Sequence, residues 1–180
     1  MRFAEQSVAA GVKHLVKLSQ FAADEASPVR FLRYHAVDFT FLRSPRRGTS
    51  SRQSAMRVSA VDVRDIAAVA TRALTESGHE GKTYTITGPA AVTHTEMAGA
   101  IAEAIGRPVA FIDVPSDAFA GALKAAGVPA WQVDGLVEDY AHYARGEAAT
   151  ISPHVREVTG ADPRDMGQFA KDYARAFVGA

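Results

Sequence analysis

Five arginines with no acidic residue among them occupy residues 43–57, in a stretch rich in serine, threonine, glycine and proline. They are Arg43, Arg46, Arg47, Arg52 and Arg57. Guanidinium groups bind phosphates and carboxylates through paired hydrogen bonds, so one interpretation is a binding site for an anion. The other is a solvated loop whose arginines are not neutralised. We favour the loop because neither a helix start nor a glycine-rich turn accompanies the run.

The histidines and aromatic residues carry weaker chemical signals. No histidine pairs with another four residues away or with a glutamate in zinc-site spacing, and the chain has no cysteine, so we predict no metal site. Trp131, Tyr140 and Tyr143 fall in one expected helix and could line a pocket for an aromatic substrate. A role in the hydrophobic core is the interpretation that we favour for such a stripe.

The composition is that of an ordinary folded domain. The 180 residues include 20 Lys and Arg against 20 Asp and Glu, so the formal net charge is zero. A general nucleic-acid-binding protein needs a basic surface to neutralise phosphates, and we therefore expect no nucleic-acid partner. No segment approaches the roughly 18 apolar residues of a membrane span, and the first residues lack the apolar core of a signal peptide. We expect a cytoplasmic protein with no membrane partner.

Capping residues and hydrophobic periodicity predict where the helices and strands lie. Asp62 is a suitable N-cap for a helix, and Thr93 with Glu96 three residues later forms a capping box. Other helices are predicted over a short segment from Ser27-Pro28 and over residues 117–126, 130–145, 152–160 and about 165–177. Strands are predicted at residues 14–18, 39–42, 83–87 and 109–113, which are rich in β-branched or aromatic residues or alternate in hydrophobicity.

The order of these elements predicts an α/β fold. Strands alternate with helices in the first half, which is typical of a parallel sheet, whereas the second half is mainly helical. We therefore predict a partial parallel sheet of the Rossmann type with a helix-rich C-terminal lobe. The two parts are expected at residues 1–90, as the remnant of a dinucleotide-binding domain, and at 91–180, as a substrate-side lobe.

Four segments in sequence order resemble the later part of the NmrA-like atypical short-chain dehydrogenases/reductases. They are Gly11-Val-Lys-His-Leu-Val-Lys-Leu-Ser19, Asp38-Phe-Thr-Phe-Leu-Arg43, the Val-Asp-Val-Arg-Asp-Ile-Ala run at 61–67, and Tyr84-Thr-Ile-Thr-Gly-Pro89. The resemblance implies an NAD(P)-binding Rossmann fold and an oxidoreductase that uses NAD(P)H to reduce a small quinone-like or carbonyl substrate.

The resemblance also implies site residues. Ser19 stands where the family has a serine at the end of its fifth strand. His35 stands at the position of the lysine of the Tyr-x-x-x-Lys pair, with Phe31 at the tyrosine position. The other frame makes Tyr34 the tyrosine but puts Asp38 where a cation is required. The candidates are Tyr34 and His35 for catalysis and Ser19, His35 and Arg43 for cofactor binding. Alternatively, Ser19 caps a strand end, and Tyr34 and His35 only contribute to packing.

The sequence departs from the family pattern in ways that predict impaired cofactor binding. The Gly-x-x-Gly-x-x-Gly turn that receives the pyrophosphate is not found, and the region after Tyr34-His35 is shortened. Whether the chain is an enzyme is therefore open. A non-catalytic, dinucleotide-sensing regulatory protein and an inactive remnant are the alternatives. The strand expected at residues 14–18 would present an unpaired edge, so self-association is a further expectation.

Overall fold

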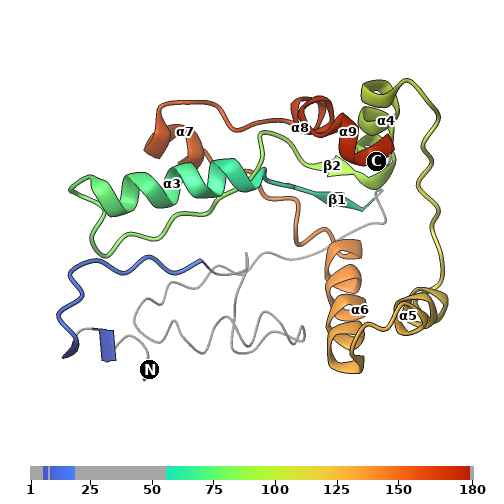
Figure 1. Ribbon diagram of the computed structural model, residues 1–180, viewed down its shortest axis with the longest axis horizontal. Helices are drawn as coiled ribbons and strands as arrows, with labels where there is room; N and C mark the ends of the chain where they lie inside the picture. Colours follow the sequence, from blue (N-terminus) through green and yellow to red (C-terminus); the bar gives the residue numbers. More distant parts are fainter. Residues whose placement is uncertain (1–5, 8, 19–55, 179–180) are drawn as a thin grey trace.

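The computed structural model describes residues 6–7, 9–18 and 56–178, and helices dominate this part of the chain (Figure 1). The elements, in chain order, are β1 Arg57–Val58, α3 Val63–Thr75, β2 Val92–Thr93, α4 His94–Ile105, α5 Ser116–Ala125, α6 Ala130–Ala144, α7 His154–Thr159, α8 Met166–Asp172 and α9 Ala174–Val178.

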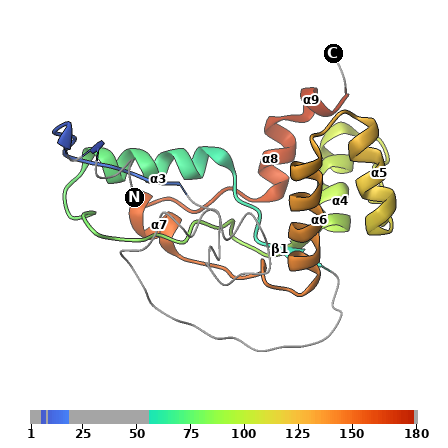
Figure 2. The same ribbon diagram turned by 90° about the horizontal axis from the view of Figure 1, so that it is seen from below.

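The helices form two groups. At one end α3 packs against α7, and at the other α4 packs against α8 and α9 while α5 packs against α6 (Figures 1 and 2). The core is small and built from short side chains. The buried hydrophobic residues among those described are Val69, Ala98, Val133, Ala148, Val155 and Ala170.

The sheet among the described residues is a two-stranded antiparallel pair. Arg57 of β1 lies opposite Thr93 of β2, and Val58 lies opposite Val92. The partial parallel sheet predicted from the sequence is not found in this part of the chain. What the described residues do form is a helix-rich structure around a short ladder that joins residues 57–58 to residues 92–93.

Three predicted strands are wrong. Residues 14–18, 83–87 and 109–113 all have irregular backbone. Their β-branched and aromatic residues favour extended conformations, but a strand also needs a neighbouring strand to complete its hydrogen bonds, and the described residues provide none for them. The segment predicted at 39–42 and the helix expected from Ser27-Pro28 lie outside the described residues.

The helix starts predicted at Asp62 and at Thr93 with Glu96 are confirmed. The Asp62 side chain accepts a hydrogen bond from the Arg64 backbone N–H at 2.8 Å and caps α3. At α4, the Thr93 hydroxyl accepts from the Glu96 N–H at 3.1 Å while the Glu96 carboxylate accepts from the Thr93 N–H at 2.7 Å. Gly106 then ends α4 in the left-handed conformation, with φ of 67°. The single helix expected at 165–177 is instead interrupted at Tyr173.

Buried carboxylates fasten α3 to the C-terminal segment. Arg64 donates to Asp62 Oδ2 at 2.6 Å and to Asp172 Oδ2 at 2.7 Å, so one guanidinium joins α3 to α8. These hydrogen bonds lower the pKa of both carboxyl groups. Asp65, which is only 3% exposed, accepts the Arg164 backbone N–H at 2.7 Å and also pairs with the Arg164 guanidinium. Residues about one hundred positions apart are thereby held together.

Gly88 lies against the segment that follows β1. Its N–H donates to the Ser59 carbonyl at 3.5 Å, and a Cβ placed on it would lie 2.0 Å from the Ala60 carbonyl oxygen. That separation is far below van der Waals contact, so the two backbones can approach this closely only because residue 88 has no side chain.

His154, the first residue of α7, takes the place of a strand partner for Thr85. Its Nδ1 lies 2.8 Å from the Thr85 N–H, which donates to it, and 2.9 Å from the Ser152 hydroxyl. The Tyr84 ring packs edge-on against His154, with ring centroids 5.6 Å apart. A side chain 69 residues away therefore satisfies backbone that was predicted to belong to a strand.

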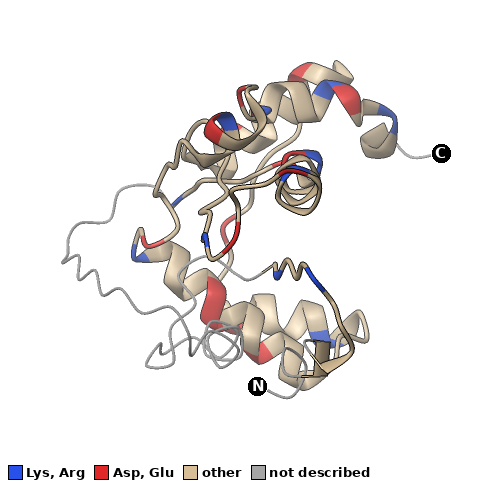
Figure 3. Cartoon of the chain, turned by 90° about the vertical axis from the view of Figure 1, so that its left-hand side faces the viewer, with Lys and Arg blue, Asp and Glu red and all other residues tan. Residues whose placement is uncertain are grey.

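Charged residues of both signs occur on several of the helices (Figure 3). Among the described helices, none combines the length and the apolar character needed to cross a membrane.

Candidate functional site

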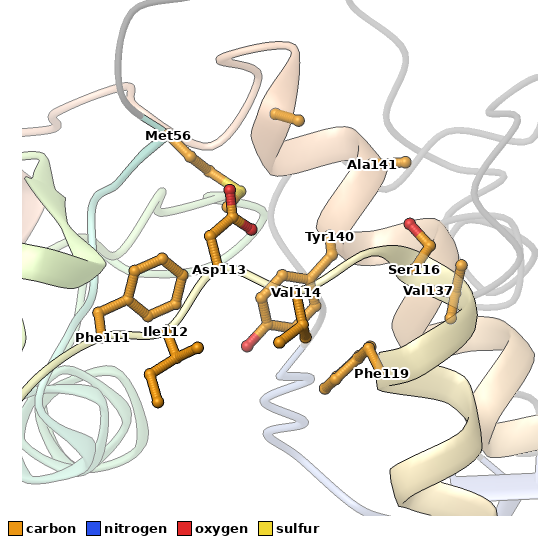
Figure 4. Close-up of a pocket in the computed structure, with 11 residues that line it drawn as sticks. Met56, Phe111, Ile112, Asp113, Val114, Ser116, Phe119, Val137, Tyr140 and Ala141 are labelled. Carbon is orange, nitrogen blue, oxygen red and sulfur yellow. The ribbon is translucent and has the colours of Figure 1, made fainter.

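A pocket of about 480 Å³ opens between α5, α6 and the irregular segment before α5 (Figure 4). Most of its lining is apolar. The described residues that line it are Met56, Phe111, Ile112, Asp113, Val114, Ser116, Phe119, Val137, Tyr140, Ala141 and Ala144. Its size and its apolar walls are those of a small-molecule site.

Four rings form one aromatic layer beside the pocket. His94 stacks on Phe111 with centroids 5.0 Å apart and on Tyr140 with centroids 5.7 Å apart, both at an interplanar angle of 29°. Tyr140 in turn contacts Phe119 at 4.9 Å. Four different parts of the chain contribute one ring each, namely the start of α4, the segment before α5, helix α5 and helix α6. The pocket wall therefore depends on how these elements pack.

His94 connects this wall to the capping box of α4. Its Nδ1 is buried and has no hydrogen-bond partner among the described residues. The imidazole is held instead by its contacts with Phe111 and Tyr140. Because Thr93 and Glu96 fix the first turn of α4, they also fix where the His94 ring meets its neighbours.

The polar groups at the pocket are few. Asp113 and Ser116 are the lining residues with polar side-chain groups besides the Tyr140 hydroxyl, and Figure 4 shows the Asp113 carboxylate between Phe111 and Met56. Asp113 is exposed and has neither a side-chain hydrogen bond nor an ion pair with any described residue. Ser116 begins α5, whose N-cap Pro115 offers no side-chain cap. The pocket therefore combines mostly apolar walls with one carboxylate that has no partner among the described residues.

A second polar cluster lies at the C-terminal end of α6. His142 is buried, and its Nδ1 contacts the Glu147 carboxylate, which also accepts from Arg145 Nε at 2.8 Å. The hydrogen bond from Arg145 is the main cause of the lowered pKa of Glu147. Burial raises the pKa of the neighbouring Tyr143 hydroxyl. This cluster fixes the C-terminal turn of α6, which carries the pocket residues Ala141 and Ala144.

The pocket does not test the site residues predicted from the sequence. Ser19, Tyr34, His35 and Arg43 lie outside the described residues, so their roles stay predictions. Of the five arginines at 43–57, Arg57 is described. It donates to the Ala91 carbonyl at 2.8 Å and to both Glu96 carboxylate oxygens at 3.2 Å. Arg57 therefore holds β1 against α4 instead of presenting a free cation.

The pocket itself was only partly foreseen. Tyr140 lies in it, as the substrate-pocket interpretation required, whereas Trp131 and Tyr143 are not among its lining residues. Phe111 and Asp113 were missed because residues 109–113 were read as a strand. The sequence did contain a signal for this part of the pocket. Asp113 interrupts an apolar run just before Pro115-Ser116, and a strand does not account for an acidic residue there.

Comparison with known proteins decides the family. No family model matches the chain. The chain is 34% identical over 204 residues to a (4-alkanoyl-5-oxo-2,5-dihydrofuran-3-yl)methyl phosphate reductase of Streptomyces griseus, a match that covers 98% of this chain and 72% of the relative. The chain belongs to the NmrA-like short-chain dehydrogenase/reductase family. Because the match runs over 204 residues and this NmrA-like chain has 180, the relative carries residues that it lacks internally, which fits the shortened interior.

Two further comparisons agree with that family. An NAD(P)H azoreductase of Xenophilus azovorans is 40% identical to this NmrA-like chain over 124 residues, covering 69% of this chain but only 43% of the azoreductase. The structure of a triphenylmethane reductase from Citrobacter sp. matches over 95% of this chain and 68% of that one, with a TM-score of 0.72 at 23% identity. The structural match shows the fold, which is that of Rossmann-like α/β reductases.

The described residues of this NmrA-like chain do not form a cradle for a dinucleotide. Such a cradle consists of backbone N–H groups at a glycine-rich turn that leads into a helix. The close backbone approach at Gly88 is filled by Ala60 of the same chain, and the buried Nδ1 of His94 faces aromatic rings. What the described residues supply is a mostly apolar pocket of about 480 Å³.

Proposed function

We propose that the protein acts as an oxidoreductase of the NmrA-like type, using NAD(P)H to reduce a small quinone or carbonyl compound. The supporting observation is the 34% identity over 98% of the chain with a protein named as a reductase. The azoreductase relative is named for NAD(P)H. The aromatic pocket adds a place where a planar acceptor could lie.

In this proposal the two halves of the chain have different roles. Residues 1–90 belong to a Rossmann domain with a parallel sheet, in which Ser19, His35 and Arg43 contact the dinucleotide. Tyr34 and His35 are the groups that would move a proton to the reduced substrate. Residues 91–180 form the substrate-side lobe that carries most of the pocket. NAD(P)H, when bound, supplies the hydride. The protein is expected in the cytoplasm.

The test measures binding and turnover separately. Calorimetric titration with NADPH and NADH is expected to give a Kd weaker than about 1 µM, because the sequence lacks the glycine turn. Oxidation of NADPH in the presence of a naphthoquinone is followed by absorbance. His35→Ala and Ser19→Ala should each lower binding or turnover. Turnover that is unchanged in both variants would contradict the roles given to these residues.

A non-catalytic, dinucleotide-sensing protein is the second candidate. The sequence supports this candidate, because Phe31 stands in place of the family's tyrosine and no Tyr-x-x-x-Lys pair is present. Cofactor binding without turnover of any quinone, carbonyl or azo compound would favour this candidate. Absence of both binding and turnover would favour an inactive remnant.

We also propose that the chain associates with a second copy of itself through residues 14–18. The exposed side chains there are apolar, with Leu15 50% and Leu18 65% exposed, and the backbone of this segment belongs to neither a helix nor a strand. Such a segment can pair with an identical one. Light scattering after size exclusion should report a dimer that Leu15→Lys with Leu18→Lys converts to a monomer. A monomer before substitution would refute the association.

A further inference from the structure

The charge at the pocket contrasts with the charge of the substrate named for the Streptomyces griseus relative. The substrate in the name of that relative is a phosphate ester, which carries negative charge at neutral pH. Among the described residues that line the pocket here, none is a lysine or arginine, and the charged one is Asp113. A carboxylate at this position repels a phosphate and attracts a cation.

We infer that the pocket selects planar aromatic ligands that carry a positive charge, such as amidinium or iminium groups, and that Asp113 is the residue that determines this specificity. As a statement about substrates, the inference rests on the proposed reductase function. As a statement about binding, it depends only on the pocket.

The aromatic walls support the same ligand class. Phe111, Tyr140 and Phe119 border the pocket, and ring faces attract cations through their quadrupole. Neighbouring rings in this layer lie 4.9 to 5.7 Å apart, so a flat ligand can contact two of them. A carboxylate beside aromatic faces favours a ring cation over both a neutral ring and an anionic one.

The helix start at Ser116 is the competing feature. The uncapped N-terminus of α5 carries a partial positive charge of about half a unit, which would favour an anion. Asp117 lies in the first turn of the same helix and offsets that partial charge. Asp113 then adds a full negative charge without a partner among the described residues. Among the residues that the structure describes, the balance of charge at this end of the pocket is therefore negative.

Three probes of nearly equal shape test the inference, namely benzamidinium, benzamide and benzoate, with charges of plus one, zero and minus one. Each is titrated into the full chain without cofactor, and backbone amide shifts are followed by NMR. We expect benzamidinium to bind about three- to fivefold more tightly than benzamide, the advantage of one partly exposed ion pair. Benzoate should bind most weakly. The shifts should fall on Phe111, Ser116 and Phe119.

Substitutions at Asp113 then test whether this residue causes the preference for the cationic probe. Asp113→Asn should remove the preference for benzamidinium, and Asp113→Lys should make benzoate the best ligand. Both changes are on an exposed side chain, and an unchanged amide spectrum elsewhere confirms the fold. Glu157→Gln is the matched control, because it removes one exposed carboxylate on α7, away from the pocket, and should leave the order intact (Figure 1).

The inference is overturned if the unsubstituted chain binds the three probes equally, binds benzoate best, or binds none of them. It is also overturned if the order survives Asp113→Asn or if the shifts map outside the pocket. None of these probes needs NAD(P)H. Loss of the proposed reductase activity would therefore leave this result standing, and failure here would leave that activity open.

Discussion

The carboxylates on the α3–α8 side of the molecule and the carboxylate at the pocket on the α5–α6 side have opposite surroundings. On the first, buried Asp62 and Asp65 are each paired with an arginine and with a backbone N–H. On the second, Asp113 has no partner among the described residues, and large apolar side chains such as Ile112 face solvent, 75% exposed. Satisfied groups fix a structure, whereas unsatisfied groups at a pocket are available to a ligand. We therefore expect the first side to stabilise the fold and the second side to bind ligands.

The largest expected effect is at Asp65. Asp65→Ala removes the partner of both the Arg164 N–H and its guanidinium, and should lower the free energy of unfolding by about 2–3 kcal/mol. Urea denaturation measures the loss. Asp162→Ala is the control, because its pair with Arg156 has both side chains about 70% exposed and should change stability by less than about 0.5 kcal/mol. Equal losses in the two variants would remove the distinction between buried and exposed pairs.

The next effect concerns Gly88. Gly88→Ala forces a methyl group into the Ala60 carbonyl, and the backbone shift should cost about 1–3 kcal/mol. Gly99→Ala offers a control within α4, where an added Cβ meets nothing within 4 Å. There alanine should stabilise by about 0.5–1 kcal/mol, because it is the better helix former. If Gly88→Ala left the free energy of unfolding unchanged, then β1 and the Gly88 segment would not be held as closely as described.

Acid should weaken the α3–α8 side. The Arg64 hydrogen bonds hold the pKa of Asp62 and Asp172 below their ordinary value of 3.8. A carboxyl with a lowered folded-state pKa stabilises the fold above its ordinary pKa, and this stabilisation is lost as the pH falls through the lowered value. Melting temperatures measured from neutral pH to about pH 2 should fall in acid, and Arg64→Gln should make the fall shallower. Identical pH profiles would contradict the role of Arg64. Glu96 and Glu147 also have lowered pKa values, and their protonation should destabilise the unsubstituted chain and the Arg64→Gln variant equally.

The smallest effect is expected on the α5–α6 side. Ile112→Ser replaces a mostly exposed side chain and should change the free energy of unfolding by less than about 0.5 kcal/mol. It should still weaken binding of all three aromatic probes, since Ile112 lines the pocket. A large loss of stability would show that Ile112 is covered, and the assignment of this side to recognition would fail.

The sequence predicted local structure well and long-range structure poorly. The caps at Asp62 and Thr93-Glu96 act within one helical turn, so their residues alone specify the result. Strand formation depends on partners, and residues 83–87 and 109–113 are irregular because the described residues offer none. The pocket was only partly predicted for the same reason, since Phe111, His94 and Tyr140 are brought together only by packing. The predicted division at residue 90 and the candidates Ser19, Tyr34, His35 and Arg43 stay predictions.

The contact between Thr85 and His154 has a consequence for the order of events during translation. The histidine that satisfies the Thr85 backbone is encoded 69 residues later, so Thr85 leaves the ribosome before its partner exists. At 5–20 residues per second, the delay is roughly 3–14 s. During that time residues 83–87, with their strong preference for extended conformations, have no native partner. A nascent chain stalled before residue 154 should therefore be the form most exposed to wrong strand pairing and to chaperones.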